Sequence, residues 1–313
     1  MKVKTAFILP AILMLLSVTG CIQKKESPLE GENPVQTEDS FPLEGQIIFQ
    51  SNIDGDNEIY MLGPGGVEKL TDNDWEDRFP TWAPGGGRIA YYANPDGNDD
   101  IFILDTTTLV ITPVTRSKDN ESDPAWYPDG QSLAFVKESQ KFLRSTGALY
   151  RIELDSGKTQ RIIPRFNQTH GIPDVSPTSP QIVFTGKRMM GWDVAIFDWE
   201  THDVSFLEDK GKSCRARFSP DGQRLAYVSS TADGKGDIWT MNPDGSGKKR
   251  ITFRDSTYDY FPSWSPDGRF IVFNSSTEHN HEADWRLMVI EVGTGTLYHL
   301  YDSPGNDTFP DWN

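Results

Sequence analysis

One short pattern recurs six times along the chain, and this repetition constrains the fold more than any other feature of the sequence. Its fullest copy reads Tyr-Phe-Pro-Ser-Trp-Ser-Pro-Asp-Gly, at residues 260–268. The copies align on a Trp or on another residue in its place, and successive copies are 44, 49, 43, 46 and 48 residues apart: Trp82, Trp126, Val175, Phe218, Trp264 and Trp312. A period of this length is typical of architectures in which each copy builds one supersecondary unit.

Each repeat predicts four short β-strands. The Trp ends a first strand, a Pro-Asp-Gly turn follows, and a second apolar strand such as 224–229 comes next. Pro and Gly supply the backbone angles that this turn requires. A polar loop leads to a third strand such as 237–241, and another turn leads to a fourth. Four apolar strands per repeat, buried on both faces, describe one blade of a β-propeller.

The two ends of the repeat region complement each other. Residues 45–71 supply a second, a third and a fourth strand without a first, whereas residues 308–312 supply a first strand alone. We expect 308–312 to be the innermost strand of the blade formed by 46–71, with Phe309 to Trp312 pairing near 46–51. The sequence therefore predicts an all-β fold over 45–313: a six-bladed β-propeller of four-stranded antiparallel blades, whose ring has no open end.

The N-terminus predicts an exported lipoprotein. Residues 1–20 resemble a lipoprotein signal peptide, with Lys2 and Lys4 before an apolar segment too short to span a membrane. Cys21 follows Val-Thr-Gly, which resembles a prokaryotic lipobox, so we expect Cys21 to carry lipid. The alternative is an ordinary signal peptide followed by an unrelated cysteine.

Residues 21–44 are polar and rich in Pro and Glu, and they predict a flexible tether between the anchor and the propeller. The expected location is extracytoplasmic. The protein would be held in the outer membrane and face the periplasm in a Gram-negative source, and would lie at the cell surface otherwise.

The net charge argues against one class of partner, and the cysteine content argues against a disulfide. The net charge of −16 argues against nucleic acid, because binding phosphates requires clustered Lys and Arg. Cys214 is the only cysteine besides Cys21, so we expect no disulfide and a small, half-buried packing role for Cys214.

The repeats resemble the WD40-like repeat of the TolB family of β-propellers. The resemblance rests on Pro-x-Trp-Ser-Pro-Asp-Gly, then an apolar strand, then Asp-Gly-x-x-Asp-Ile-Tyr/Trp, and it is strongest at 214–252 and 260–273. It covers residues 45–313. It implies a six-bladed, usually extracytoplasmic propeller that acts in protein–protein contacts at the cell envelope. The chain departs from TolB itself, which carries an α/β domain before its propeller, whereas here only the tether separates Cys21 from the first strand.

One position in each repeat is a candidate for a binding ring. The residue three before the motif Pro begins the innermost strand, and four of the six residues at this position are acidic. A ring of carboxylates at the channel mouth could hold a hard cation such as Ca²⁺, or a basic peptide. Alternatively, these side chains cap turns through hydrogen bonds to the backbone. The candidate ring residues are Asp77, Glu121, His170, Asp259 and Asp307, with Ser213 at the remaining position.

Catalytic interpretations have less support. His279 and His281 lie in an acidic loop and are weak candidates for binding a metal ion. Oligogalacturonate lyase, a propeller enzyme, has a metal site that needs several convergent His residues. A Gly-x-Ser-x-Gly nucleophile motif is absent from the sequence.

The sequence predicts a non-enzymatic, lipid-anchored propeller that acts as a protein- or peptide-binding scaffold at the envelope. We expect it to be monomeric and to need no cofactor. The alternatives are a metal-dependent enzyme acting on polysaccharide, or a module that binds Ca²⁺ or a small ligand.

Overall fold

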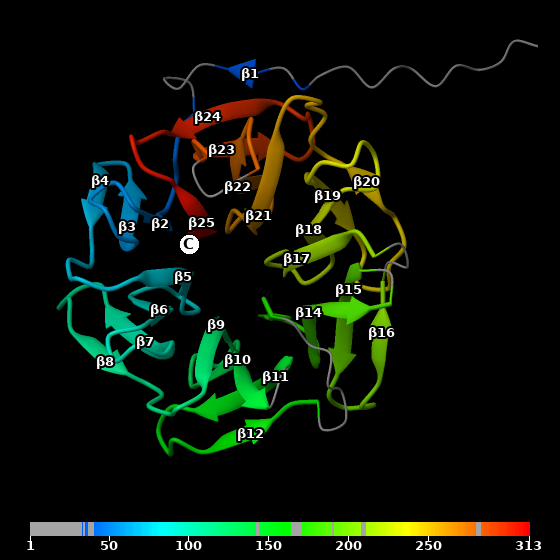
Figure 1. The fold of residues 1–313 in the computed structure, drawn as a ribbon. Helices are drawn as coiled ribbons and strands as arrows, with labels where there is room; N and C mark the ends of the chain where they lie inside the picture. Colours follow the sequence, from blue (N-terminus) through cyan, green and yellow to red (C-terminus); the bar gives the residue numbers. More distant parts are fainter. Residues whose placement is uncertain are drawn as a thin grey trace, which may run out of the picture. The chain divides into compact units, whose positions relative to one another are not determined.

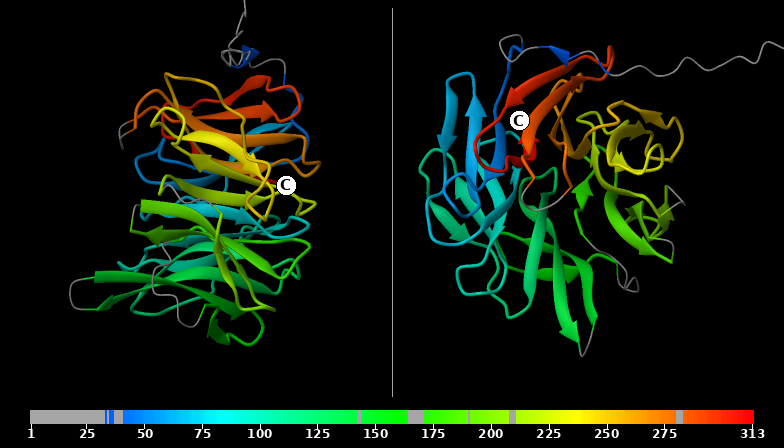
Figure 2. Two further views of the ribbon diagram at one scale, coloured as in Figure 1. Left: turned by 90° about the vertical axis from the view of Figure 1, so that its right-hand side faces the viewer. Right: turned by 45° about the horizontal axis from the view of Figure 1, so that its top comes forward.

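Twenty-five β-strands and no helix make up the part of the chain that the structure describes. The computed structural model describes residues 33, 35–36, 41–141, 144–163, 171–189, 191–207, 211–279 and 283–313. Residues 32–313 form one unit, in which the strands group into six sheets around an axis (Figures 1 and 2). Within the described ranges, no helix has the length and apolar character needed to cross a membrane.

Each sheet is one blade, and its strands are named from the axis outward. Blade 1 contains β25 (Thr308–Trp312), β2 (Ile47–Ser51), β3 (Glu58–Gly63) and β4 (Gly66–Lys69). Blade 2 contains β5 (Asp77–Trp82), β6 (Arg88–Ala93), β7 (Asp100–Asp105) and β8 (Ile111–Pro113). Blade 3 contains β9 (Asn120–Trp126), β10 (Ser132–Lys141), β11 (Arg144–Glu153) and β12 (Thr159–Arg161).

The other three blades follow the same order. Blade 4 contains β13 (Asp174–Val175), β14 (Gln181–Arg188), β15 (Gly191–Asp198) and β16 (Val204–Phe206). Blade 5 contains β17 (Ser213–Phe218), β18 (Leu225–Ser229), β19 (Asp237–Met241) and β20 (Lys249–Arg250). Blade 6 contains β21 (Tyr258–Trp264), β22 (Phe270–Ser276), β23 (Arg286–Glu291), β24 (Leu297–Tyr301) and, at its outer edge, β1 (Val35–Gln36).

The predicted closure of the ring is confirmed. The C-terminal strand β25 pairs antiparallel with β2, with Ile47 opposite Trp312 and Gln50 opposite Thr308. Two backbone hydrogen bonds between Gln46 and Asn313, of 2.8 and 2.9 Å, extend this pairing. Blade 1 is therefore built from both ends of the repeat region, as the incomplete repeats predicted.

The core lies between blades. Each cluster of buried apolar side chains draws on two neighbouring sheets, as where Ile48 and Ile59 of blade 1 meet Trp82, Ile89 and Tyr91 of blade 2. Both faces of a sheet are buried in this way, which explains why the strands are apolar throughout rather than alternating. The repeated Trp residues are part of these clusters, so they pack between neighbouring blades.

Part of the segment predicted to be a tether contacts the propeller. β1 pairs in parallel with β24, so blade 6 has one strand more than the expected four. The buried side chain of Asn33 donates to the carbonyls of Ile251 and Gly295, at 3.1 and 2.9 Å, and accepts from the N–H of Phe253. It satisfies backbone groups that would otherwise lack partners, which the composition of the segment alone does not indicate.

Phe41→Ala tests whether this contact stabilises the ring. The half-buried Phe41 ring packs against Phe270, Tyr298 and Trp312, with centroids 5.2, 5.1 and 5.9 Å away. We expect the free energy of unfolding to fall by about 2 kcal/mol, measured by urea denaturation. Glu44→Ala is the control, because only the backbone carbonyl of Glu44 contacts Trp312. An unchanged midpoint for Phe41→Ala would show that the segment contributes nothing to stability.

Candidate functional site

Six side chains reach the axis from residues with left-handed backbone. Their φ angles lie between 51° and 57°, a region that residues other than Gly rarely adopt. Five of them coincide with an irregularity in the pairing of the innermost strand, and such bulges re-aim side chains. Each directly precedes the motif Pro or, in blade 5, Ala216. These axial residues are Phe79, Asp123, Ile172, Arg215, Phe261 and Phe309.

The preceding blade stabilises the unusual backbone at the axis. The N–H of Phe79 donates to Gln50 Oε1 at 3.0 Å. In the same way, the N–H of Arg215 donates to Thr185 Oγ1 at 3.0 Å. These acceptors come from the second strand of the neighbouring blade, so packing of the blades fixes the direction of the axial side chains.

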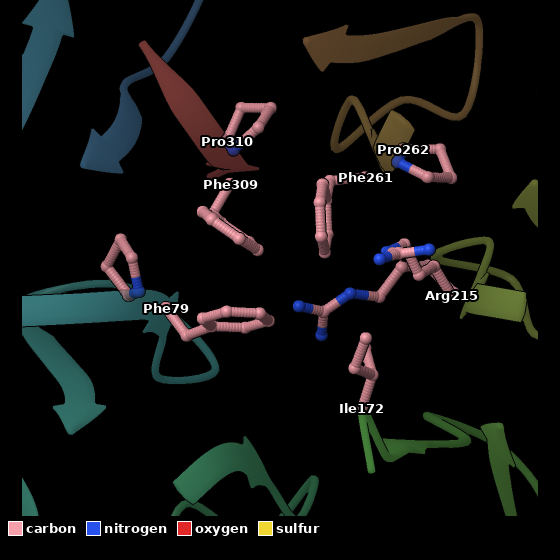
Figure 3. Close-up of a pocket in the computed structure, with 9 residues that line it drawn as sticks. Phe79, Ile172, Arg215, Phe261, Pro262, Phe309 and Pro310 are labelled. Atoms are coloured by element: carbon pink, nitrogen blue, oxygen red, sulfur yellow. The ribbon is translucent and has the colours of Figure 1, made fainter. Parts of the chain in front are cut away.

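Three of the axial side chains close the channel (Figure 3). The ring of Phe309 lies 3.7 Å from that of Phe79 and 3.9 Å from that of Phe261, between centroids. The cavity that these rings line together with Ile172 and Arg215 has a volume of about 10 Å³. This volume suits a single water molecule, so the described residues leave no substrate-sized tunnel past the three Phe rings.

Arg215 is the positively charged member of the axial set. Its guanidinium stacks on Phe261 at 4.4 Å and on Tyr260 at 5.0 Å from the ring centroids. Nη1 donates to Cys214 Sγ at 2.9 Å. The side chain is half-buried, and aromatic rings cover one side of its guanidinium. Partial burial lowers the local dielectric constant, which strengthens the attraction between Arg215 and an approaching anion.

An aromatic cluster lies beside Arg215, where the innermost strands begin. The ring of His279 stacks on Tyr258 and Tyr260, at 5.0 and 5.3 Å between centroids, and Trp285 lies 5.8 Å from Tyr260. We call Arg215 and these four aromatic residues the strand-start mouth. Tyr258, Tyr260 and Trp285 are half-buried and His279 is exposed, so the mouth presents aromatic surface to solvent.

The opposite end of the axis is polar. Arg217 pairs with Asp174 at 3.2 Å, and Asp311 accepts from Ser263 Oγ at 2.9 Å and from the N–H of Trp82 at 2.7 Å. Burial raises the pKa of Asp174 to about 6, against the lowering effect of Arg217. Most polar groups here already have partners. A recess of about 200 Å³ opens among them, and we call it the strand-end mouth.

The structure places the predicted acidic ring inside the protein rather than at a mouth. The described members, Asp77, Glu121, Asp259 and Asp307, are at most 2% exposed. Neighbouring groups hydrogen-bond to these carboxylates. Asp307, for example, accepts from the N–H and the hydroxyl of Ser303, both at 2.8 Å. His170 lies outside the described residues. Cation binding by this set stays a prediction.

At the joints between successive blades, carboxylates of this set lie close to a second acidic side chain. Asn73 donates to both Asp77 and Glu58, at 2.8 and 3.3 Å. Burial raises the pKa of Asp77 to about 7, and the nearby negative charge of Glu58 adds to the effect. One oxygen of Asp77 is buried and finds no donor among the described residues.

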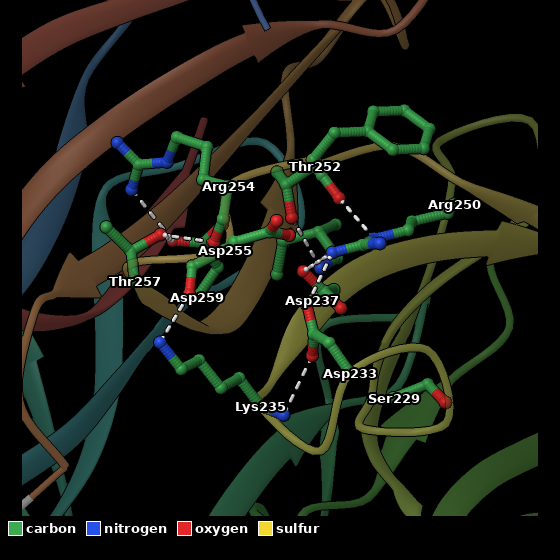
Figure 4. Close-up of polar contacts among 12 residues, drawn as sticks. Ser229, Asp233, Lys235, Asp237, Arg250, Thr252, Arg254, Asp255, Thr257 and Asp259 are labelled. Carbon is green, nitrogen blue, oxygen red and sulfur yellow. Dashed lines mark hydrogen bonds and ion pairs between the residues drawn. The ribbon is translucent and has the colours of Figure 1, made fainter. Parts of the chain in front are cut away.

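Blades 5 and 6 repeat this arrangement, now with two arginines (Figure 4). Arg250 bridges Asp237 and Asp233, at 2.9 and 2.8 Å, and Arg254 pairs with Asp259 at 3.0 Å. Burial raises the pKa of Asp237 to about 7, despite the opposing charge of Arg250. The buried acids therefore act in the joints between blades.

The other predicted site residues are not gathered into one centre. His279 belongs to the aromatic cluster, whereas His281 and Cys21 lie outside the described residues. Cys214 is a free, half-buried thiol beside Arg215. Within the ranges that the structure describes, no three His, Cys, Asp or Glu side chains are grouped so that they could hold a metal ion.

The sequence carries a signal for the axial residues. The residue directly before the motif Pro is Phe in three blades, at positions 79, 261 and 309. The packing between blades already uses the repeated Trp, so a second repeated aromatic residue indicates another surface. That surface is the axis.

Comparison with known protein families finds the same repeats. A family model described as "TolB beta propeller domain" matches residues 65–214 and 172–282. Dipeptidyl-peptidase 5 of Porphyromonas gingivalis is 26% identical over 285 residues, which cover 85% of this chain and 37% of the peptidase. The chain thus spans little more than a third of that relative's length.

Solved structures share the fold. TolB from Acinetobacter baumannii superposes with a TM-score of 0.72 at 19% identity, covering 86% of this chain and 66% of that one. Oligogalacturonate lyase in complex with manganese gives a TM-score of 0.59 at 14% identity, covering 83% and 74%. At these identities, the likeness concerns the architecture alone.

Proposed function

Because the chain belongs to the family of TolB beta propeller domains, we propose that it is an extracytoplasmic scaffold that binds a protein or peptide at the strand-start mouth. The same fold occurs in a peptidase and in a lyase, so the fold alone does not decide between binding and catalysis. The proposal therefore rests on the mouth itself.

The observation that carries the proposal is the exposed aromatic cluster beside Arg215, above a closed axis. Aromatic residues and Arg are enriched in the centres of protein interfaces, because they bury a large area and lose little side-chain freedom. Tyr258, Tyr260 and Trp285 are held in contact with one another or with His279 before any partner arrives. Such preorganisation lowers the entropic cost of binding.

The narrow axis favours a ligand that rests on the surface of the mouth. Where the three Phe rings meet, the axial cavity of about 10 Å³ has no room for a sugar or a peptide bond. The relationship to the peptidase covers 37% of that enzyme's length and is compatible with a binding propeller.

We place the scaffold at the cell envelope, held by lipid on Cys21. The signal-like segment 1–20 and the lipobox-like sequence before Cys21 support this location. A tethered propeller would meet a membrane-bound partner at high effective concentration, so modest affinity at the mouth would suffice.

Photo-crosslinking in intact cells tests the proposal. A photoreactive residue at position 285 should capture a defined partner, whereas the same residue at position 67, an exposed site on the outer strand β4, should not. Cys21→Ser should move the protein out of the membrane fraction and reduce the yield of the crosslink. Equal capture from positions 285 and 67 would argue against a site at the mouth, and membrane retention of Cys21→Ser would argue against the lipid anchor.

A further inference from the structure

Three other half-buried arginines, Arg217, Arg250 and Arg254, are paired with carboxylates, whereas Arg215 is paired with none that the structure describes. Arg217 pairs with Asp174, Arg254 with Asp259, and Arg250 with two aspartates. Arg215 forms no ion pair with any described residue, although the chain carries 46 acidic and 30 basic side chains. An arginine that stays unpaired in so acidic a protein is available to an anion from outside.

The guanidinium of Arg215 donates few hydrogen bonds within the described part of the chain. Its face is covered by the rings of Phe261 and Tyr260. Its single hydrogen bond goes to Cys214 Sγ, a weak acceptor, and its buried Nε finds no acceptor among the described residues. A planar guanidinium with free N–H groups matches a carboxylate, which accepts two parallel hydrogen bonds.

The surroundings favour a carboxylate that has an apolar neighbour. Lys235 lies over the ring of Tyr258, at 5.4 Å, and adds positive charge to the same side of the mouth. Asp123, the acidic axial residue, attracts Arg215 electrostatically, but no ion pair joins these two described residues, and Asp123 Oδ2 accepts from the N–H of Ile172 at 3.0 Å. The rings of Tyr258 and Trp285 belong to the same cluster as Tyr260, on which Arg215 stacks, and they can pack against an aromatic or aliphatic side chain.

We propose that Arg215 binds a carboxylate of the partner, either a free C-terminus or an acidic side chain, next to an apolar residue that contacts the aromatic cluster. This inference rests on the proposed function, because it names the group that the mouth recognises. Arg215 acts as the anchor, and the aromatic residues supply contact area.

A pair of small probes isolates the charge. N-acetylphenylalanine and N-acetylphenylalanine amide have nearly the same shape, but only the acid carries a carboxylate. Each is titrated into the full chain and followed by calorimetry or ligand-observed NMR. We expect the acid to bind at least about tenfold more tightly than the amide, and the difference to shrink at high salt.

Arg215→Gln should remove the preference for the acid, and Arg215→Lys should keep part of it. Arg151→Gln is the matched control, since Arg151 also stacks on an aromatic ring, Tyr127 at 4.3 Å, but is 40% exposed and lies in β11, away from the axis. It should leave the preference unchanged. Thermal denaturation of each variant checks that it folds. If Arg215→Gln does not fold, the reduced preference for the acid in Arg215→Lys provides the test.

Three blocked tetrapeptides distinguish the sources of the carboxylate. One ends in a free phenylalanine carboxylate, one is its C-terminal amide, and one is an amide with glutamate before phenylalanine. Preference for the first assigns the site to a C-terminus, and preference for the third assigns it to an acidic side chain.

Equal binding of acid and amide, no saturable binding of either, or unchanged discrimination in Arg215→Gln would overturn the inference. The outcome is separable from that of the proposed function. If position 285 captures a partner while the probes show no preference, the scaffold stands and the carboxylate site is wrong. If the probes discriminate but position 285 captures nothing, the site stands and its ligand is not an envelope protein.

Discussion

Deleting residues 308–313 is expected to destabilise the whole propeller, lowering its free energy of unfolding by more than about 5 kcal/mol. This loss is comparable to the total stability of many domains. It would appear in urea denaturation as an early unfolding transition, or as failure to accumulate folded protein. The reason is that β25 is the innermost strand of blade 1 and, among the described strands, the one that joins the last repeat to the first.

Individual contacts of β25 show where the loss comes from. Trp312 is 8% exposed and packs with Ile47, Val272 and Val289, so Trp312→Ala alone should cost about 3–5 kcal/mol. The carboxylate of Asp311 accepts from blades 2 and 6, so it ties together sheets on both sides of the closure.

Asn313→Ala serves as the control for the deletion, because its backbone makes the two bonds to Gln46 and is retained. It should change the free energy of unfolding by less than about 1 kcal/mol. A deletion variant that unfolds within a few degrees of the intact chain would contradict the closed ring.

Stability is expected to fall as pH rises from 5 to 8, which is the second large effect. Burial raises the pKa of Asp77 and of Asp237 from 3.8 to about 7. A pKa raised in the folded state means that folding favours the protonated form. The contribution of each group is therefore complete below about pH 4 and is lost as pH rises through 7.

The size of this effect follows from the two pKa values. A pKa raised from 3.8 to about 7 corresponds to roughly 4 kcal/mol per group. We expect the midpoint of thermal unfolding to fall by roughly 5–10 °C between pH 5 and pH 8. Exposed carboxylates such as Asp244 have lowered pKa values, and their contribution is lost only as pH falls below 4.

The double variant Asp77→Asn, Asp237→Asn tests the assignment, because asparagine imitates the protonated acid. It should flatten the pH dependence. The Asp77→Asn change alone should leave stability at pH 5 nearly unchanged, whereas Asp237→Asn also removes the ion pair with Arg250 and lowers it. Asp267→Asn, at an exposed turn, should keep the slope of the unsubstituted protein. A stability that increases from pH 5 to 8, or a double variant with the original slope, would show that these acids are charged in the folded protein.

The architecture could be predicted from the sequence because it depends on repeated features. The incomplete repeat 45–71 lacks a first strand, and 308–312 supplies one. Their pairing follows from the order of strands within a blade. The position of the Trp residues between blades follows for the same reason. Local patterns suffice where every blade solves the same packing problem.

The axis could not be read from strand alternation. Asp77 and Phe79 are two residues apart, so a regular strand would point both the same way. The bulge between Arg78 and Thr81, with φ of 52° at Phe79, sends Phe79 to the axis while Asp77 stays buried between blades. The same irregularity in five of the blades turns the residue before the motif Pro, three times a Phe and once Arg215, toward the axis, whereas the described acidic residues two positions earlier stay buried.

The sequence pattern also does not predict the contact between the N-terminal segment and the propeller. Asn33 is a polar residue in a polar stretch, and its buried position depends on backbone groups of Ile251, Phe253 and Gly295. These groups lie more than 200 residues away in the chain. Composition does not predict so specific a set of hydrogen bonds.

The most direct test of the central claim is the affinity of the crosslinked partner for variants at the two mouths. Trp285→Ala should weaken binding at least about tenfold, as is typical of a central aromatic contact. Asp174→Asn, at the strand-end mouth, should leave the dissociation constant within about twofold. If Asp174→Asn weakens binding while Trp285→Ala has no effect, the partner binds the other end of the axis and the account is wrong.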